Sequence, residues 1–144
     1  MQVEFHSNIA DKLNSACRFL RKAQQAGAAV VVCADQSTLD RLDVALWTFD
    51  PLAFVAHTRV RGNEALPSRA PVQAWLADNS RSVSCREVLL NLGPDMVEGW
   101  EEFARVVEIV SAEPADAIAG RGRWREYSSR PGLALIHQPR ATST

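Results

Sequence analysis

Residues 120–127, GRGRWREY, hold the side chains with the clearest binding chemistry in the chain. Arginine carries a planar, permanent charge that can hold a carboxylate or a phosphate through two parallel hydrogen bonds. Arg121 and Arg125 are four residues apart and Trp124 is three from Arg121, so on a helix these side chains share one side. Three interpretations stay open: a solvated helix face, a contact with single-stranded nucleic acid in which Trp124 stacks on a base, and a pocket for a carboxylate or an acidic peptide.

A second group of aromatic side chains lies in residues 41–57, RLDVALWTFDPLAFVAH. Trp47 closes an amphipathic stretch, and Phe54 and His57 follow within ten residues. Composition alone favours burial of these rings, since tryptophan and phenylalanine are usually buried. The alternative is an exposed apolar docking surface for another protein, because aromatic side chains dominate interface energetics.

Residue types that serve catalysis or bind metals are present, but their spacing favours neither task. The histidines lie at the ends of expected strands without HxxxH or HExxH spacing, and the cysteines form no CxxC pair. These residues are His6, His57, His137, Cys17, Cys33 and Cys85. A row of acids is interpreted as the solvated face of a helix. The acids are Glu98, Glu101, Glu102 and Glu108. No catalytic residue and no metal ligand is assigned.

Strand-like and helix-like patterns alternate along the chain. Strands are expected at 2–5, 28–34, 52–57, 71–77, 87–93, 106–111 and 133–138, and helices at 8–27, 35–49, from 94 onward and at 114–129. The valine-rich run 28–34 is typical of a strand covered on both faces. The alternation predicts a single three-layer α/β domain over residues 1–138, with a mostly parallel central sheet, helices on both faces and a flexible tail at 139–144.

The predicted fold is Rossmann-like, yet the sequence indicates no nucleotide site. No GxGxxG follows the first or second expected strand, and no GxxxxGK[ST] occurs, although these loops let backbone amides approach phosphate. The glycine pair of GRGR is a weak signal for a phosphate cradle. No cofactor is therefore predicted.

Charge and composition limit the partners. With 16 basic and 17 acidic side chains in 144 residues, the chain has no long-range positive field to attract DNA or anionic lipid. No secretion signal and no apolar stretch of membrane-spanning length is found, and the odd number of cysteines fits a reducing compartment. A cytoplasmic protein without membrane contact is expected.

Three blocks of the sequence resemble the chi subunit family of bacterial DNA polymerase III, an accessory component of the clamp-loader complex. The blocks are RLDVALWTFDPLAFVAH, VLLNLG and FARVVEIVSAEPADAIAGRGRWREYSSRPGLAL, and the likeness runs through nearly the whole chain. The most specific part is LDxALW with the segment that carries Phe54. The resemblance implies a single α/β domain without nucleotide binding or catalytic activity, in agreement with the missing phosphate loops.

The resemblance also implies two protein partners. One is the psi subunit, which ties chi to the clamp loader and whose surface on chi is used in some bacteria by a helicase-like protein. This surface falls on Trp47 and Phe54. The other partner is the acidic tail of single-stranded-DNA-binding protein, which ends in a phenylalanine carboxylate. DNA is then contacted only indirectly.

The family's tail-binding site falls on the stretch described first. Val110 provides an apolar position, Arg121 is the central carboxylate-binding arginine, and Trp124 and Arg125 stand where an aromatic and a basic residue are usual. A further basic position of the family is Ala117 in this chain, which suggests a weaker acidic contact or compensation by Arg123.

Two other classes of function remain as alternatives. The first is a direct single-stranded nucleic-acid binder that uses Trp124 and the arginines, against which the near-neutral charge argues. The second is a nucleotide-dependent enzyme, which would need a phosphate loop.

Overall fold

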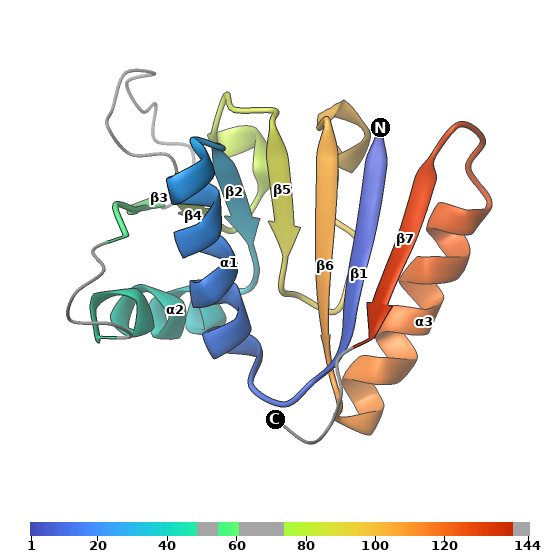
Figure 1. Cartoon of the computed structure of the whole chain (residues 1–144), viewed down its shortest axis with the longest axis horizontal. Helices are drawn as coiled ribbons and strands as arrows, with labels where there is room; N and C mark the ends of the chain where they lie inside the picture. Colours follow the sequence, from blue (N-terminus) through green and yellow to red (C-terminus); the bar gives the residue numbers. More distant parts are fainter. Residues whose placement is uncertain (49–54, 61–73, 140–144) are drawn as a thin grey trace.

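The fold is a seven-stranded, entirely parallel sheet with helices on both faces (Figure 1). The structure, a computed structural model, describes residues 1–48, 55–60 and 74–139. The strands are β1 (Gln2–Ile9), β2 (Val30–Cys33), β3 (Thr58–Val60), β4 (Ala74–Ala77), β5 (Val88–Asn91), β6 (Arg105–Ser111) and β7 (Ala134–Pro139). The helices are α1 (Lys12–Ala26), α2 (Gln36–Thr48) and α3 (Pro114–Ser128), with short 3-10 helices η1 (Ser80–Ser82) and η2 (Trp100–Glu102). The predicted α/β class is confirmed.

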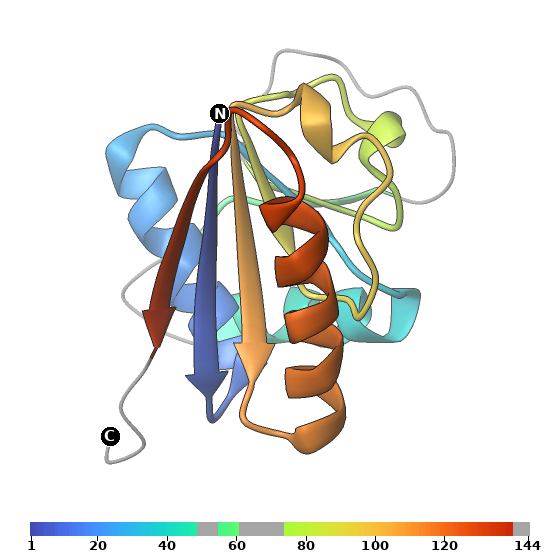
Figure 2. The ribbon, with the colours of Figure 1, turned by 90° about the vertical axis from the view of Figure 1, so that its right-hand side faces the viewer.

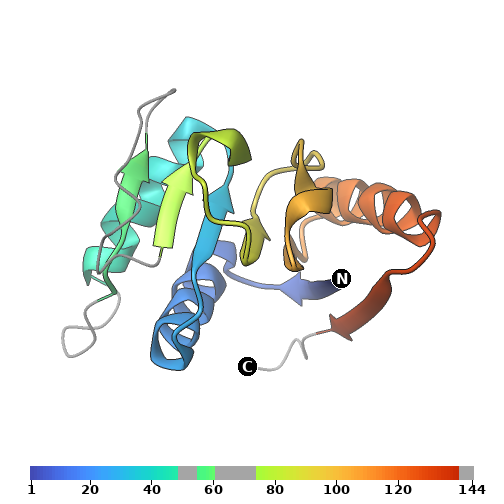
Figure 3. The ribbon, with the colours of Figure 1, turned by 90° about the horizontal axis from the view of Figure 1, so that it is seen from above.

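The strand order β3-β4-β2-β5-β6-β1-β7 places the first strand of the chain near one end of the sheet. α1 therefore crosses over β6 and β5 to reach β2 in the middle. α2 packs near β4, whereas α3 packs on β6 and β1 (Figures 1 and 3). As a result, α2 and α3 lie toward opposite ends of the sheet.

The two faces of the sheet have separate apolar cores. α1 and α2 cover one face, and α3 with the segments around η1 and η2 covers the other (Figures 2 and 3). β2 contributes to both cores: Val30 and Val32 face α1 and α2, while Val31 and Cys33 face the α3 side. This confirms the prediction of a strand covered on both faces and explains its unbroken apolar sequence.

Local signals define the ends of the first two helices. Asp11 accepts a hydrogen bond from the Asn14 backbone N–H at 3.0 Å, and Gly27 ends α1 in the left-handed conformation with φ of 75°. Asp35 caps α2 by accepting from the backbone N–H of Thr38 at 3.2 Å. Asp35 thereby satisfies a backbone N–H in the first turn of α2.

Two expected elements are wrong. The helix expected from residue 94 is an irregular segment containing only η2, because Gly99 adopts φ of 85° and stops helical continuation. Residues 55–57 of the expected strand 52–57 are irregular, and β3 begins only after them, at Thr58. Positions 52–54 and most of the expected tail, 140–144, lie outside the described residues.

No helix among residues 1–48, 55–60 and 74–139 is long and apolar enough to cross a membrane.

Candidate functional site

The clearest candidate site is a pocket of about 570 Å³ between α3 and the strands β1, β6 and β7. Figure 2 shows α3 beside these strands, with α1 on the far side of the sheet. Three of the residues predicted for peptide binding, Val110, Arg121 and Trp124, line this pocket together. Ala117, the position where a basic residue was expected, lines it too.

The floor of the pocket depends on the close approach of α3 to β6. A Cβ atom added to Gly120 would lie 2.8 Å from Val110 Cγ1, closer than any side chain tolerates. Glycine at this position lets the helix rest directly on the strand. The first glycine of GRGR therefore serves helix packing, and it leaves Val110 at the base of the pocket.

Aromatic rings form one wall. The ring centroids of Phe5 and Trp124 are 5.1 Å apart in an edge-to-face arrangement, and the Trp124 and His137 centroids are 5.6 Å apart. His137 Nε2 lies 2.6 Å from Ser7 Oγ, which joins β7 to β1. The wall therefore combines a large apolar surface with a polar edge.

Arg121 is the permanent positive charge of this pocket. Its side chain is exposed, and it makes no hydrogen bond or ion pair within the described part of the chain. Arg125 is also exposed but does not line the pocket. A free guanidinium above an apolar floor is suited to hold a carboxylate whose neighbouring group is apolar.

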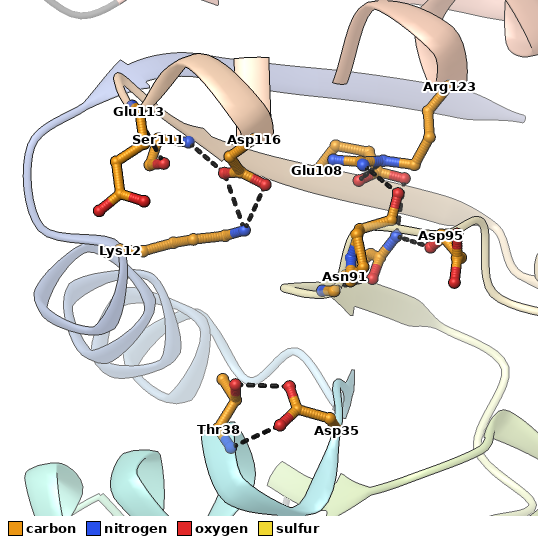
Figure 4. Close-up of polar contacts among 12 residues, drawn as sticks. Lys12, Asp35, Thr38, Asn91, Asp95, Glu108, Ser111, Glu113, Asp116 and Arg123 are labelled. Atoms are coloured by element: carbon orange, nitrogen blue, oxygen red, sulfur yellow. Dashed lines mark hydrogen bonds and ion pairs between the residues drawn. The ribbon is translucent and has the colours of Figure 1, made fainter. Parts of the chain in front are cut away.

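Arg123 lies on the opposite side of α3 and corrects the sequence-based interpretation. Its side chain is only 3% exposed, and its Nε donates to Glu108 Oε1 at 2.9 Å (Figure 4). Its Nη1 donates to the Pro94 carbonyl at 2.6 Å. A guanidinium held this way cannot reach an external peptide, so Arg123 does not compensate for Ala117.

Glu108 is the centre of this buried cluster and is likewise not the solvated acid that the sequence predicts. Its carboxylate accepts from Asn91 Nδ2 at 3.1 Å and from the Tyr127 hydroxyl at 2.8 Å, as well as from Arg123. Burial raises the pKa of Glu108, and the charge of Arg123 is the main cause that opposes this rise. Burial also raises the pKa of Tyr127, so its hydroxyl remains a donor. The cluster fixes α3 on β6 and β5.

The start of α3 is held by a second polar cluster. Asp116 accepts from the Ser111 backbone N–H at 2.7 Å and pairs with Lys12 Nζ at 3.0 Å (Figure 4). Burial raises the pKa of Asp116, but the hydrogen bonds from Ser111 and Lys12 outweigh it and bring the pKa below its usual value. This pair joins the first turns of α1 and α3.

An exposed apolar surface lies on α2, far along the sheet from the pocket. The side chains of Val44 and Trp47 are 64% and 60% exposed. The Trp47 ring lies 5.3 Å from the ring of His57, whose Nε2 is 2.7 Å from Asp43 Oδ1. The question left open by the sequence is thus answered for Trp47, which is not a core residue. Phe54 lies outside the described residues.

A family model described as the DNA polymerase III chi subunit matches residues 1–135. The chain belongs to the DNA polymerase III chi subunit family. The chi subunit of Pseudomonas aeruginosa is 33% identical over 117 residues, which cover 81% of this chain and 78% of that protein. The chi subunit of Escherichia coli is 30% identical over 113 residues, or 77% of this chain and 74% of that protein. The predicted family is confirmed, and the chain is an accessory subunit of a DNA replication complex.

The carboxyl edge of the sheet, where Rossmann-like folds bind phosphate, carries carboxylates in this chi subunit. Asp11 caps α1, Asp35 caps α2, and Asp116 lies in the first turn of α3. The hydrogen bonds from Thr38 lower the pKa of Asp35, so it is ionised at neutral pH. Negative charges at all three helix starts disfavour a phosphate at this edge.

Two of the three cysteines of this chi subunit, Cys17 and Cys33, are buried and offer little reactivity. Burial raises the pKa of Cys17 to about 11 and that of Cys33 to about 12, which keeps both protonated at neutral pH. Within the described residues, no group of three or more His, Cys, Asp or Glu side chains is placed to hold a metal ion.

Sequence reasoning missed the pocket residues that come from β1 and β7, among them Phe5, Ser7 and His137. Phe5 and Ser7 lie on β1, and His137 lies on β7, 130 residues after Ser7 along the chain. β1 pairs with β7 residue by residue. Alternation along β1 could have placed Phe5 and Ser7 on one face. The pairing with β7 could not be derived from spacing.

Proposed function

We propose that this chi subunit is a non-catalytic adaptor that binds the acidic C-terminal tail of single-stranded-DNA-binding protein and the psi subunit on two separate surfaces. It would thereby link the clamp loader to the protein that coats single-stranded DNA. The observation that carries the proposal is the exposed guanidinium of Arg121 beside the apolar floor of the α3 pocket.

A C-terminal phenylalanine presents a carboxylate and a ring at a fixed separation. In the proposed complex Arg121 holds the carboxylate, and the ring packs among Val110, Trp124 and Phe5. Arg125, exposed one turn further along α3, attracts the aspartates that precede the phenylalanine. The apolar floor buries the phenylalanine ring, and Arg121 makes binding specific for a peptide that ends in a free carboxylate.

The psi subunit is assigned to the surface around Trp47. An exposed tryptophan next to an exposed valine on one helix face is a suitable anchor, because large aromatic side chains supply most of the energy of protein interfaces. Phe54 belongs to this proposal by family resemblance alone. The same surface is the proposed site for a helicase-like protein in bacteria that have one.

The separation of the two surfaces supports the adaptor role. α2 and α3 lie on opposite faces of the sheet and toward its opposite ends (Figure 1). Two partners bound at these helices would not compete for space. This arrangement is what a bridging subunit requires.

The test is a comparison of arginine variants in binding to a fluorescent tail peptide. Arg121→Ala should weaken binding about tenfold or more, because a charge-assisted hydrogen bond contributes about 1.5 to 3 kcal/mol. Arg18→Ala removes an exposed arginine from α1 on the other face and should bind like the unmodified protein. Equal affinities of Arg121→Ala and Arg18→Ala would contradict the proposal.

A second candidate function is direct binding of single-stranded nucleic acid, favoured by the presence of Arg121 and Trp124 in one pocket. It predicts micromolar binding of a bare oligonucleotide that weakens steeply with salt. The adaptor proposal predicts that such an oligonucleotide neither binds tightly nor displaces the tail peptide.

A further inference from the structure

The α3 pocket contains a second side chain that can become positive. Among the described residues that line it, Arg121 and His137 are the ones able to carry positive charge, and none is a carboxylate. Ala117 contributes only a methyl group, and Arg123 points into the core. The electrostatic character of the pocket therefore depends on Arg121 and on the protonation of His137.

The position of His137 is fixed by the sheet. β7 pairs with β1 so that His137 is opposite Phe5, and His137 Nε2 lies 2.6 Å from Ser7 Oγ. Its ring packs against Trp124 at 5.6 Å between centroids. The imidazole is exposed yet held in one orientation at the rim of the pocket.

Ser7 is a partner that tolerates both protonation states of His137. A hydroxyl can donate to a neutral imidazole nitrogen or accept from a protonated one. When Nε2 accepts from Ser7, Nδ1 carries a proton, and when the ring is protonated both nitrogens do. Either state leaves an N–H that can donate to a ligand oxygen.

We propose that His137, positioned by Ser7, forms a subsite for the carboxylate side chain of an acidic residue that precedes the C-terminal residue of the bound peptide. The inference rests on the proposed function, since it concerns the same pocket. His137 supplies the positive charge that Ala117 lacks. Unlike a lysine or an arginine, it supplies this charge only when protonated.

The direction of the pH dependence follows from the groups that face the imidazole. Ser7 and Phe5 lie beside it on β1 and Trp124 packs on it from α3, all without formal charge. Arg121, which lines the same pocket, is the charged group there, and its charge is positive. A carboxylate bound beside an imidazole favours the protonated ring. Binding is thus coupled to proton uptake, and the affinity for an acidic peptide rises as the pH falls from 7.5 to 6.0.

The experiment titrates the full chain with two peptides that end in phenylalanine, one with aspartates before it and one with asparagines. For the unmodified protein, affinity for the aspartate peptide should rise about threefold between pH 7.5 and pH 6.0, the effect of one partly exposed ion pair. The asparagine peptide should show no such rise. His137→Gln should remove the rise, since glutamine can still bond to Ser7 but carries no charge.

The matched control is His6→Gln. His6 lies on β1, and its Nε2 is 3.4 Å from Glu4 Oε2 rather than in the pocket. The His6→Gln variant should keep the full pH dependence. Ser7→Ala, a second variant that leaves the imidazole in place, should reduce the rise by releasing the ring orientation.

The outcomes separate the two proposals. Suppose that His137→Gln keeps both the affinity and the pH dependence of the unmodified protein, while Arg121→Ala weakens binding. The proposed His137 subsite is then wrong, and the proposal that the α3 pocket binds the tail peptide is retained. If neither Arg121→Ala nor removal of the terminal phenylalanine affects binding, the proposed function itself fails, and the subsite fails with it.

Discussion

Arg121 and Arg123 are two residues apart in one helix and have opposite surroundings. Arg121 is exposed in a pocket and has no partner in the described part of the chain, whereas Arg123 is buried and bonded to Glu108. A rotation of about 100° per residue places them on opposite sides of α3. Within one basic motif, Arg123 therefore stabilises the fold from the buried side of α3, whereas Arg121, on the exposed side, is the residue proposed to bind a partner.

The largest effect on stability is expected from breaking the buried ion pair between Arg123 and Glu108. Arg123→Ala leaves the buried Glu108 without its charge partner, which should lower the free energy of unfolding by about 3 to 5 kcal/mol. Arg121→Ala should change it by about 0.5 kcal/mol or less, because the side chain is exposed. Urea unfolding of both variants measures the contrast. Similar losses of stability in the two would show that the buried and exposed sides of α3 do not differ in this way.

The two glycines of the motif provide a second contrast. Gly120→Ala places a methyl group within 2.8 Å of Val110 Cγ1 and should destabilise the fold by about 1 to 3 kcal/mol. Gly122→Ala enters open space and should stabilise α3 by about 0.5 to 1 kcal/mol. Thermal unfolding of the pair checks the opposite signs. If both substitutions destabilised the fold, the close packing of Gly120 on Val110 would not explain the loss of stability in Gly120→Ala.

A smaller effect is expected at the start of α3. The pKa of Asp116 is lower in the folded chain than in the unfolded chain, so the ionised carboxylate stabilises the fold above about pH 4. This stabilisation is lost below about pH 4, as the pH falls through the pKa that Asp116 has in the folded chain. Asp116→Asn should therefore cost about 1 kcal/mol at pH 7 and less at pH 3. Unfolding midpoints of the two proteins should converge on acidification. If the difference between the two unfolding midpoints grew toward pH 3, the ionised Asp116 carboxylate would not be the stabilising group.

The smallest effect on stability is expected at the other exposed surface. Trp47→Ala should leave the unfolding free energy within about 0.5 to 1 kcal/mol of the unmodified protein, because the ring is 60% exposed. It should nevertheless abolish co-purification with the psi subunit. Leu46→Ala, a buried neighbour on α2, is the control and should lower stability by about 2 to 5 kcal/mol. A Trp47→Ala protein that unfolds as easily as Leu46→Ala would indicate a core role for the tryptophan.

Helical and strand periodicity predicted most of the fold. The valine run of β2 and the pattern of α3 indicated their elements to within a few residues, because both are buried or terminated by strong local signals. The helix expected after residue 94 was wrong, since Trp100 and Phe103 are spaced as in a helix but pack from an irregular segment stopped by Gly99. Periodicity reports burial, and it does not by itself report backbone conformation.

The site was predictable in part. Spacing on α3 brought Arg121 and Trp124 together, and the same spacing could have separated Arg123, which shares its side of the helix with Tyr127. Its burial depends on Glu108, a strand residue that no local pattern links to it. The exposure of Trp47 and the entry of His137 into the pocket depend on tertiary packing in the same way.

The most direct test of the account is isothermal titration of the unmodified protein with the last ten or so residues of the host's single-stranded-DNA-binding protein, with and without the terminal phenylalanine. We expect binding in the micromolar range that disappears when the phenylalanine is removed, because in the proposed complex the α3 pocket holds both the ring and the carboxylate of that residue. Equal binding of the two peptides, or none by either, would contradict it.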